Sequence, residues 1–394
     1  MSRPGGAARV CSTAARICLD RRLGLRVALF ASLSVSSAVL AQDGSPGLTE
    51  PTVLPAFNPG APACEPPPGL TKSLVFARDN DREFMLGAAR GLTKAAHDRG
   101  LEYRSTAAHN DAARMIEQIE KLRSEKVGAV IAAPVDPESL APSLQRLIWA
   151  GSYVGTIVPP PAISLLNAPQ YLTGKVLGDA ATAYIRDRLD GRAKVVLLTH
   201  DSLEFLAPRF TAMRDSLRAV PGAVIVADIS PVTVNPEGGL ATMRTILLAN
   251  PEVDVVLGAD TVVLGALAAV RAAGKARPQQ FFGGIDGEAD ALVEMKKPGS
   301  PYKISVSLAS AVFGYAMGQH AADWLEGRSI PQAIDTLPIA LTAETLARYE
   351  GDQADPASVY ATPSRRDAYL KMFGNICYTT RNRYLNFPWS SEAR

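Results

Sequence analysis

Residues 252–287 read EVDVVLGADTVVLGALAAVRAAGKARPQQFFGGIDG, and the folding pattern of the whole chain can be inferred from them. The β-branched run at residues 253–257 predicts a fully buried strand. Asp260 follows two small residues and is placed to cap a helix. A second apolar run, at residues 281–285, predicts another strand, which stops at Asp286. A strand, a capped helix and a strand form a βαβ unit, so we expect a parallel sheet.

The same alternation of apolar runs and amphipathic segments extends through most of the chain. Strands are predicted at residues 73–77, 101–105, 127–132, 153–158, 194–199, 224–229 and 303–308. Helices are predicted at residues 83–97, 174–189, 209–219, 238–249 and 309–325, and two more open at Asp111 and after Asp136. Such regular alternation is typical of the α/β class with doubly wound parallel sheets. This many strands fits two sheets better than one.

The first 41 residues have the pattern of a secretory signal. Six arginines precede an apolar run at residues 27–40, which ends just before Ala41. A membrane anchor is the alternative, but it needs a longer apolar span than this run. Arg21 and Arg22 also fit a twin-arginine signal. We expect cleavage after Ala41 and export to the periplasm.

The net charge of the chain changes when this signal is removed. The full chain of 394 residues carries a formal charge of +2, and loss of six Arg and one Asp lowers it to −3. The basic balance therefore belongs to the signal, and the remainder shows no surplus for binding nucleic acid. The chain that remains after removal of the signal is long enough for two domains with substantial cores.

Cysteine usage agrees with export. Cys11 and Cys18 lie in the signal, and Cys64 and Cys377 remain after cleavage. Cysteines in an oxidising compartment tend to pair, so we predict a disulfide between Cys64 and Cys377 that ties the N-terminal arm to the C-terminal tail.

Both ends of the chain lie outside the alternating pattern. Residues 42–71 carry eight prolines and little that packs, which predicts an extended, polyproline-like arm acting as a spacer. Residues 351–394 contain several aromatic residues, which either pack the tail onto a lobe or form a surface for a partner.

The segment ADTVVLGALAAVRAAGK followed by GGIDG resembles the second lobe of type I periplasmic binding proteins, the ribose- and galactose-binding group, and of LacI-type effector domains. The resemblance runs from about Lys72 to about Leu337. It implies two doubly wound parallel-sheet lobes joined by a three-strand hinge. It also implies a small-molecule ligand, no cofactor, and an ABC-type membrane permease as partner. We expect a monomer, and a LacI-type repressor is excluded because a signal stands where its DNA-binding helices would be.

The resemblance also implies where the chain crosses between lobes. The crossings fall near residues 168–171, near Leu308 and near Pro338. The N-terminal lobe is then residues 72–168 with 309–337, and the C-terminal lobe is residues 169–308 with 338–350. The tail at residues 351–394 exceeds the usual length of the family.

A solute held between the lobes would meet the residues that follow the strands, since ligands of open α/β sheets bind beyond the carboxyl ends of the strands. The candidate ligand-binding residues are Arg78, Asp79, Asp81, Phe84, Ala133, Asp136, Val158, His200, Asp201, Arg209, Asp260, Asp286 and Ser307.

Several candidates have a structural alternative. The resemblance matches Asp286 to an Asp that accepts hydrogen bonds from sugar hydroxyls, although it can also be an ordinary turn residue. Asp260 and Asp136 can each be helix N-caps. Phe84 matches an aromatic ring that stacks on the sugar, but it can equally pack in the core. Arg209 matches the Arg of a helix-opening motif and is either a ligand residue or part of a loop.

The charged loop after the first strand has two interpretations. Arg78, Asp79 and Asp81 are denser in charge than a buried loop tolerates unless they are paired or bound to ligand, because an unpaired buried charge is costly. They can also form a solvated rim.

The departures from the family bear on the ligand class. Sugar-binding members carry polar residues where this chain has Ala133, Val158 with Pro159, and Ala259. Each departure removes a group that would hold hydroxyls. Two ligand classes therefore remain open. One is a sugar or polyol held by other residues, and the other is a more apolar, lipid- or sterol-like ligand.

The sequence gives little support for an enzyme. His200, Asp201 and Ser202 are triad residue types, but neighbours in a loop do not face one another as a nucleophile and a base must. Nucleophile-elbow, dinucleotide and phosphate-loop motifs are absent, and the four histidines lack metal-ligand spacing. We expect a solute-binding protein that serves an ABC importer. The alternative is a periplasmic sensor that presents its closed form to a membrane receptor or kinase.

Overall fold

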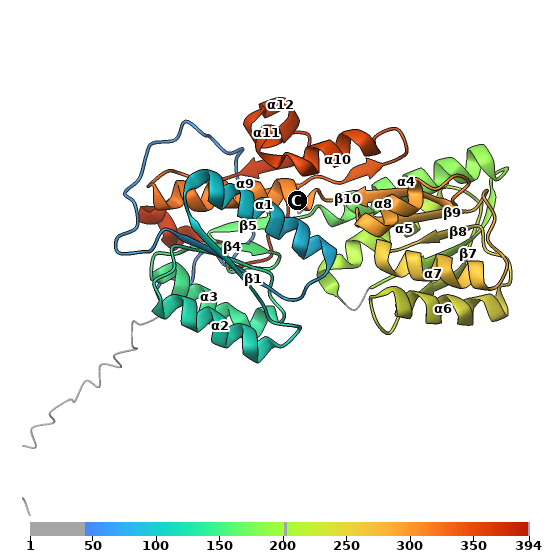
Figure 1. Ribbon diagram of the computed structural model, residues 1–394, viewed down its shortest axis with the longest axis horizontal. Helices are drawn as coiled ribbons and strands as arrows, with labels where there is room; N and C mark the ends of the chain where they lie inside the picture. Colours follow the sequence, from blue (N-terminus) through green and yellow to red (C-terminus); the bar gives the residue numbers. More distant parts are fainter. Residues whose placement is uncertain (1–43, 201–202, 393–394) are drawn as a thin grey trace, which may run out of the picture. The chain divides into compact units, whose positions relative to one another are not determined.

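The computed structural model describes residues 44–200 and 203–392. This part of the chain forms two β-sheets with helices on their faces (Figure 1). The first sheet has seven strands in the order β13-β11-β5-β4-β3-β1-β2, and the second has six in the order β12-β10-β9-β8-β6-β7. Only β13 and β12 run antiparallel to their neighbours, each at an edge. The predicted fold class, α/β with two doubly wound lobes, is confirmed.

We call each sheet with its covering helices a lobe. The strands of the first lobe are β1 (Ser73–Arg78), β2 (Glu102–Ala107), β3 (Ala129–Ala132), β4 (Tyr153–Ile157), β5 (Ser164–Asn167), β11 (Ala333–Thr336) and β13 (Leu370–Phe373). The strands of the second lobe are β6 (Arg192–Leu198), β7 (Gly222–Ile229), β8 (Val255–Leu257), β9 (Phe281–Asp286), β10 (Tyr302–Ser307) and β12 (Ile339–Leu341).

The helices alternate with these strands. They are α1 (Glu83–Arg99), α2 (Ala112–Ser124), α3 (Pro137–Trp149), α4 (Gln170–Arg188), α5 (Ala207–Arg218), α6 (Pro236–Ala249), α7 (Asp260–Ala272), α8 (Ala289–Met295), α9 (Ser310–Leu325), α10 (Leu346–Ala354), α11 (Pro356–Ala361) and α12 (Pro363–Arg366), with short 3₁₀ turns at Glu204–Leu206 and Tyr378–Arg383. Figure 1 shows α1 and α9 on one face of the first sheet and α2 and α3 on the other. None of the described helices is both long and apolar enough to cross a membrane.

The sheets form because their strands are apolar on both faces, as parallel strands covered by helices must be. All residues of β3 and β8 are buried, and five of the six in β1 are buried. The parallel strands of each lobe end at one edge of its sheet, and most of the candidate ligand residues follow these strand ends.

Four short strands are not predicted from the sequence: β5, β11, β12 and β13. Of these, β5 follows three prolines, which favours a loop, yet it pairs in parallel with β4 and β11. All four of its residues are buried, so its side chains are fixed by the tertiary core and not by a local pattern.

The chain passes between the two sheets more often than the family pattern implies. It leaves the first sheet after β5, returns after β10 and leaves again between β11 and β12. A fourth passage follows, because β13 in the tail pairs with β11 of the first sheet. The tail therefore contributes a strand to the first lobe.

The N-terminal arm is packed and does not act as a free spacer. Leu54 is buried in a cluster with Leu165, Leu385 and Trp389, so the arm contacts both β5 and the tail. The arm and the tail also exchange backbone hydrogen bonds, as in the contact from Phe57 N–H to the Met372 carbonyl at 2.9 Å. The sequence predicts that Cys64 ties the arm to the tail, and the structure adds contacts before that point, because the few apolar residues of the arm find partners far away in the sequence.

The predicted disulfide is present between Cys64 and Cys377. It closes a loop of 313 residues between the arm and the tail. A cross-link over such a long loop removes much conformational freedom from the unfolded chain.

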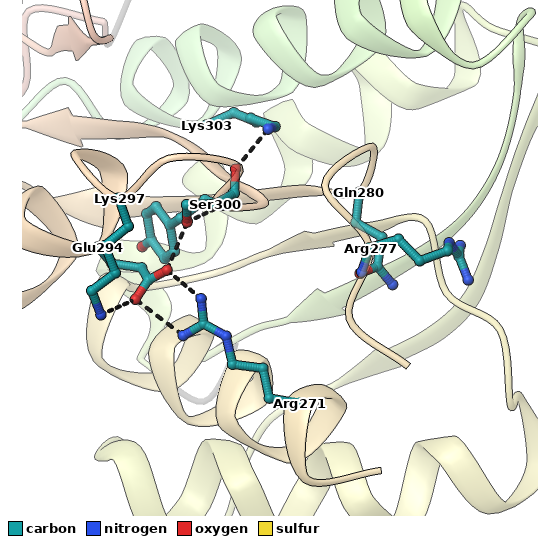
Figure 2. Close-up of polar contacts among 8 residues, drawn as sticks. Arg271, Arg277, Gln280, Glu294, Lys297, Ser300 and Lys303 are labelled. Atoms are coloured by element: carbon teal, nitrogen blue, oxygen red, sulfur yellow. Dashed lines mark hydrogen bonds and ion pairs between the residues drawn. The ribbon is translucent and has the colours of Figure 1, made fainter. Parts of the chain in front are cut away.

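A buried ion cluster sets the relative positions of α7, α8 and β10 in the second lobe (Figure 2). The Glu294 carboxylate on α8 accepts hydrogen bonds from Arg271 at the end of α7, from Lys297, and from Ser300 before β10. Burial would raise the pKa of Glu294, but these hydrogen bonds outweigh it and lower the pKa to about 2. The cluster is thus ionised and satisfied at neutral pH, and it joins α7, which begins at Asp260, to β10, which ends at Ser307.

We predict that the double variant Cys64→Ser, Cys377→Ser folds but is less stable than the wild type by about 2–4 kcal/mol, because its unfolded state is less constrained. Thermal unfolding followed by circular dichroism measures this difference. Wild-type protein treated with a phosphine reductant is the control and should unfold at the midpoint of the double variant. Equal midpoints for the oxidised wild type and the variant would contradict the prediction.

Candidate functional site

The charged loop after β1 pairs mostly with itself. Arg78 contacts Asp81 at 2.9 Å, and Asp79 contacts Arg82 at 3.1 Å. Asp81 is half exposed, while the Nε atom of Arg78 is buried without a partner among the described residues. The charges of the loop are therefore paired with one another. The Nε–H of Arg78 still has no hydrogen-bond partner among the described residues.

At the carboxyl edge of the second sheet, Arg209 and Asp286 form a loose ion pair. The Arg209 guanidinium, on α5, lies 4.0 Å from the Asp286 carboxylate at the end of β9. Its Nε donates a hydrogen bond of 2.9 Å to Gln170 at the start of α4. A separation of 4.0 Å is too long for a hydrogen bond, so an atom of a bound molecule can contact both groups.

Both groups of this pair are desolvated. Burial lowers the pKa of Arg209, which is only 6% exposed, and the charge of Asp286 opposes that shift. Burial raises the pKa of Asp286, and the charges of Arg209 and Arg82 oppose it. Electrostatic interactions are stronger at such sites than in water, so a polar ligand would gain from them.

Asp286 also has an unusual backbone. Its φ angle is 118°, a region that favours glycine and that costs other residues on the order of 1–3 kcal/mol. Non-glycine residues keep such conformations mainly where the surrounding structure imposes them, and these positions cluster at binding sites. The strained backbone therefore supports a functional role for Asp286.

Close packing of α4 on α5 positions Arg209. A Cβ atom on Gly174 would lie 1.8 Å from the carbonyl oxygen of Arg209, so only glycine allows this approach. The glycine at position 174 thus brings Gln170 and Arg209 together.

Asp260 is not the N-cap of α7, contrary to the sequence prediction. The N-cap is Ala259, and Asp260 is the first residue of the helix with a fully buried side chain. Its carboxylate accepts hydrogen bonds from Tyr302 Oη at 2.6 Å, Ser305 Oγ at 2.7 Å and Glu288 N–H at 2.9 Å. It thereby connects β10 to the turn after β9. A local pattern could not reveal this role, because its partners lie far along the chain.

Glu288 is a further carboxylate that the sequence analysis missed. It lies two residues beyond Asp286 and is partly buried. Burial, followed by the charges of Asp286 and Asp260, raises the pKa of Glu288 to about 8. Burial also raises the pKa of Asp260 to about 7. Three carboxyl groups therefore share this edge of the sheet, which concentrates hydrogen-bonding capacity there.

The remaining candidates of the second lobe differ in accessibility. Ser307 is fully buried, and its hydroxyl lies 2.5 Å from the Tyr349 hydroxyl and accepts from Ala309 N–H. His200 follows β6 and is partly buried. Asp201 lies outside the described residues, so its candidate role stays a prediction.

The remaining candidates of the first lobe lie past β1, β3 and β4. Phe84 is partly buried, with its ring 5.5 Å from that of Phe313, which favours core packing. Ala133 is buried, and Val158 is partly buried with a φ of 24°. Asp136 is the N-cap of α3, accepting from Glu138 N–H at 3.2 Å, so the predicted cap is confirmed.

The described residues contain no group of three or more His, Cys, Asp and Glu side chains that could hold a metal ion. Arg209, Asp286, Glu288 and Gln170 form the most polar cluster near the sheet edge, and we call it the Arg209 cluster. Only Arg209 and Asp286 were predicted, because the burial of Glu288 and the pairing of Gln170 depend on the folded structure.

Comparison with known proteins identifies the family. Residues 73–329 match the model of the periplasmic binding protein domain, which spans well over half of the chain. The chain belongs to the periplasmic binding protein family. This confirms the resemblance noted in the sequence, and a curated relative is a ribose import binding protein.

Three relatives illustrate the likeness of this periplasmic binding protein to others. It is 26% identical over 274 residues to the ribose import binding protein RbsB of Bacillus subtilis, covering 66% of this chain and 83% of the relative. A 5-methylthioribose transporter solute-binding protein from Thermotoga lettingae, in complex with 5-methylthioribose, has a TM-score of 0.62 at 22% identity, covering 73% of this chain and 92% of that one. An ABC transporter solute-binding protein from Bacillus halodurans with bound myo-inositol has a TM-score of 0.61 at 19% identity, covering 72% and 99%.

The raised carboxyl pKa values predict how the stability of this binding protein varies with pH. The pKa of Glu288 is higher in the folded state than its ordinary value of 4.5, so the folded state holds a proton that the unfolded state has released. Its contribution to stability therefore falls as pH rises from about 4.5 to about 8. Glu288→Gln removes this loss of stability. We expect the free energy of unfolding of the variant to exceed that of the wild type by on the order of 1 kcal/mol at pH 8.5, and by little at pH 5.

Thermal unfolding across this pH range measures the effect of Glu288→Gln. Glu252→Gln is the matched control, because Glu252 is exposed in the loop before β8. A stability difference that is the same at pH 5 and pH 8.5 would rule out the assigned role of Glu288.

Proposed function

We propose that this periplasmic binding protein closes its two lobes on a small solute and delivers it to an ABC-type permease. The Arg209 cluster carries the proposal, because its loose ion pair leaves polar groups available for a ligand. The family assignment supports it as well. The hinge lies where the chain passes between sheets, and we assign residues 72–168 with 309–337 to one lobe and residues 169–308 with 338–350 to the other.

The ligand that fits best is a sugar or polyol with one apolar part. The Arg209 cluster offers charged hydrogen-bonding groups in the second lobe, which suit hydroxyl groups. The first lobe presents the partly buried Val158 after β4, backed by the core residues Ala133 and Phe84, and this suits an apolar part of a ligand. The relative solved with 5-methylthioribose has a ligand that combines a sugar with a methylthio group, whereas another relative holds the polyol myo-inositol.

Closure requires that the bound ligand contacts both lobes. A ligand shifts an open–closed equilibrium only by the difference between its affinities for the two states. A ligand bound by the Arg209 cluster alone would not favour closure. The apolar groups of the first lobe, together with Arg78 and Arg82, supply the second set of contacts in this proposal. Asp260 and Ser307 are left out of the ligand set, since internal groups already occupy them.

We predict that Asp286→Ala weakens ligand binding at least tenfold, or about 1.4 kcal/mol, because it removes a charged acceptor beside Arg209. Isothermal titration calorimetry with ribose, 5-methylthioribose and myo-inositol first selects the ligand and then measures its affinity for the variant. Asp228→Ala is the control, because Asp228 pairs with Arg214 at 2.7 Å on the far edge strand β7. Unchanged affinity of Asp286→Ala for the selected ligand would remove Asp286 from the site.

A further inference from the structure

A cavity lies away from the Arg209 cluster, between the N-terminal arm, α9 and the tail. Its volume is about 820 Å³, within the range of small-molecule sites. Its wall includes Phe57 and Ala61 of the arm, His320 of α9, and Lys371, Met372 and Phe373 of the tail. None of its lining residues belongs to the second sheet or to the ligand set proposed above.

The walls of this cavity are bonded to one another. Phe57 N–H donates to the Met372 carbonyl at 2.9 Å, and Gly374 N–H donates to the Pro55 carbonyl at 2.7 Å. The disulfide between Cys64 and Cys377 then ties the arm to the tail just beyond these contacts. The cavity is therefore framed by fixed segments, and most of its wall lies outside the residues that match the family domain.

His320 forms part of the wall of this cavity. The side chain is 2% exposed, and its Nε2 lies 3.0 Å from the Tyr360 hydroxyl. Its Nδ1 is buried, has no partner among the described residues and is out of reach of a water-sized molecule. Burial lowers the pKa of His320 to about 3, so the ring is neutral at pH 7 and adds no charge to the wall.

The charges that line the cavity leave one cation for a ligand. Arg328 lies 3.3 Å from Asp323, and Arg366 lies 3.0 Å from Asp367. Lys371 has no carboxylate within 4.0 Å in the described parts of the chain, but it lies opposite the buried Asp335 in the pairing of β11 with β13, and its charge opposes the rise that burial causes in the pKa of Asp335. Two of the three cations are thus paired inside the wall, and the third favours a ligand with a single negative charge.

We propose that this cavity binds a second small molecule, an amphipathic organic anion with one negative charge. Its charged group pairs with Lys371, and its apolar body lies against Phe57, Met372 and Phe373. His320 forms a neutral part of the wall. The site goes beyond the proposed transport function, because it is separate from the solute that the lobes enclose.

The test uses 8-anilinonaphthalene-1-sulfonate, an aromatic sulfonate that matches this ligand class and fluoresces when bound. Titration of the disulfide-bonded protein should give saturable binding. Lys371→Glu should weaken that binding about fivefold or more, because an attractive charge becomes a repulsive one. Lys121→Glu is the matched control, since Lys121 is an exposed lysine on α2 and its variant should bind within twofold of the wild type.

A second variant keeps the test decisive if the charge change has an indirect effect. Ala61→Trp places a large side chain into the cavity and should abolish probe binding, while thermal unfolding verifies that the variant is folded. Probe binding by Lys371→Glu and Ala61→Trp with wild-type affinity would overturn the proposal, because the dye would then bind elsewhere. Absence of saturable binding by the wild type would also overturn it. Solute binding by calorimetry is an independent readout, so failure here leaves the proposed function standing.

Discussion

An arginine and a carboxylate, Arg209 and Asp286, are held 4.0 Å apart at the carboxyl edge of the second sheet, close enough to attract but too far apart to hydrogen-bond. Both are desolvated, so their interaction is strong yet incomplete. A direct hydrogen bond between the two side chains would stabilise the fold more than this separation does. The surrounding structure keeps it open, and a ligand oxygen placed between the two groups would complete both sets of bonds.

Several features outside the pair maintain its geometry. Gln170 holds the guanidinium by its Nε, and Gly174 allows α4 to approach α5. On the other side, Asp260 accepts hydrogen bonds from Tyr302, Ser305 and the Glu288 N–H, which fixes the turn after β9. The strained backbone of Asp286 is stabilised by this network. Glu294 also joins Arg271, in the last turn of α7, to Ser300 before β10, so the two elements that hold the Asp260 network are tied a second time.

The sequence predicts the fold well because apolar periodicity and helix caps are local signals, and Asp136 is an example that the structure confirms. Features that depend on distant partners were missed or wrong. Asp260 looked like a cap, but its partners Tyr302 and Ser305 are more than 40 residues away. The packing of the arm could not be predicted, because the partners of Leu54 lie on β5 and in the tail, far away in the sequence. The raised pKa of Glu288 likewise arises from burial that no local pattern shows.

In the proposed function, a solute bound at the Arg209 cluster draws the two lobes together. Double electron–electron resonance measures this directly with nitroxides on two exposed positions, Lys121 on α2 and Leu248 on α6, which is 87% exposed. With the solute that calorimetry selects, the account predicts that the distance distribution between the labels becomes narrower and its main peak moves to shorter distances. An unchanged distribution at saturating solute would contradict it.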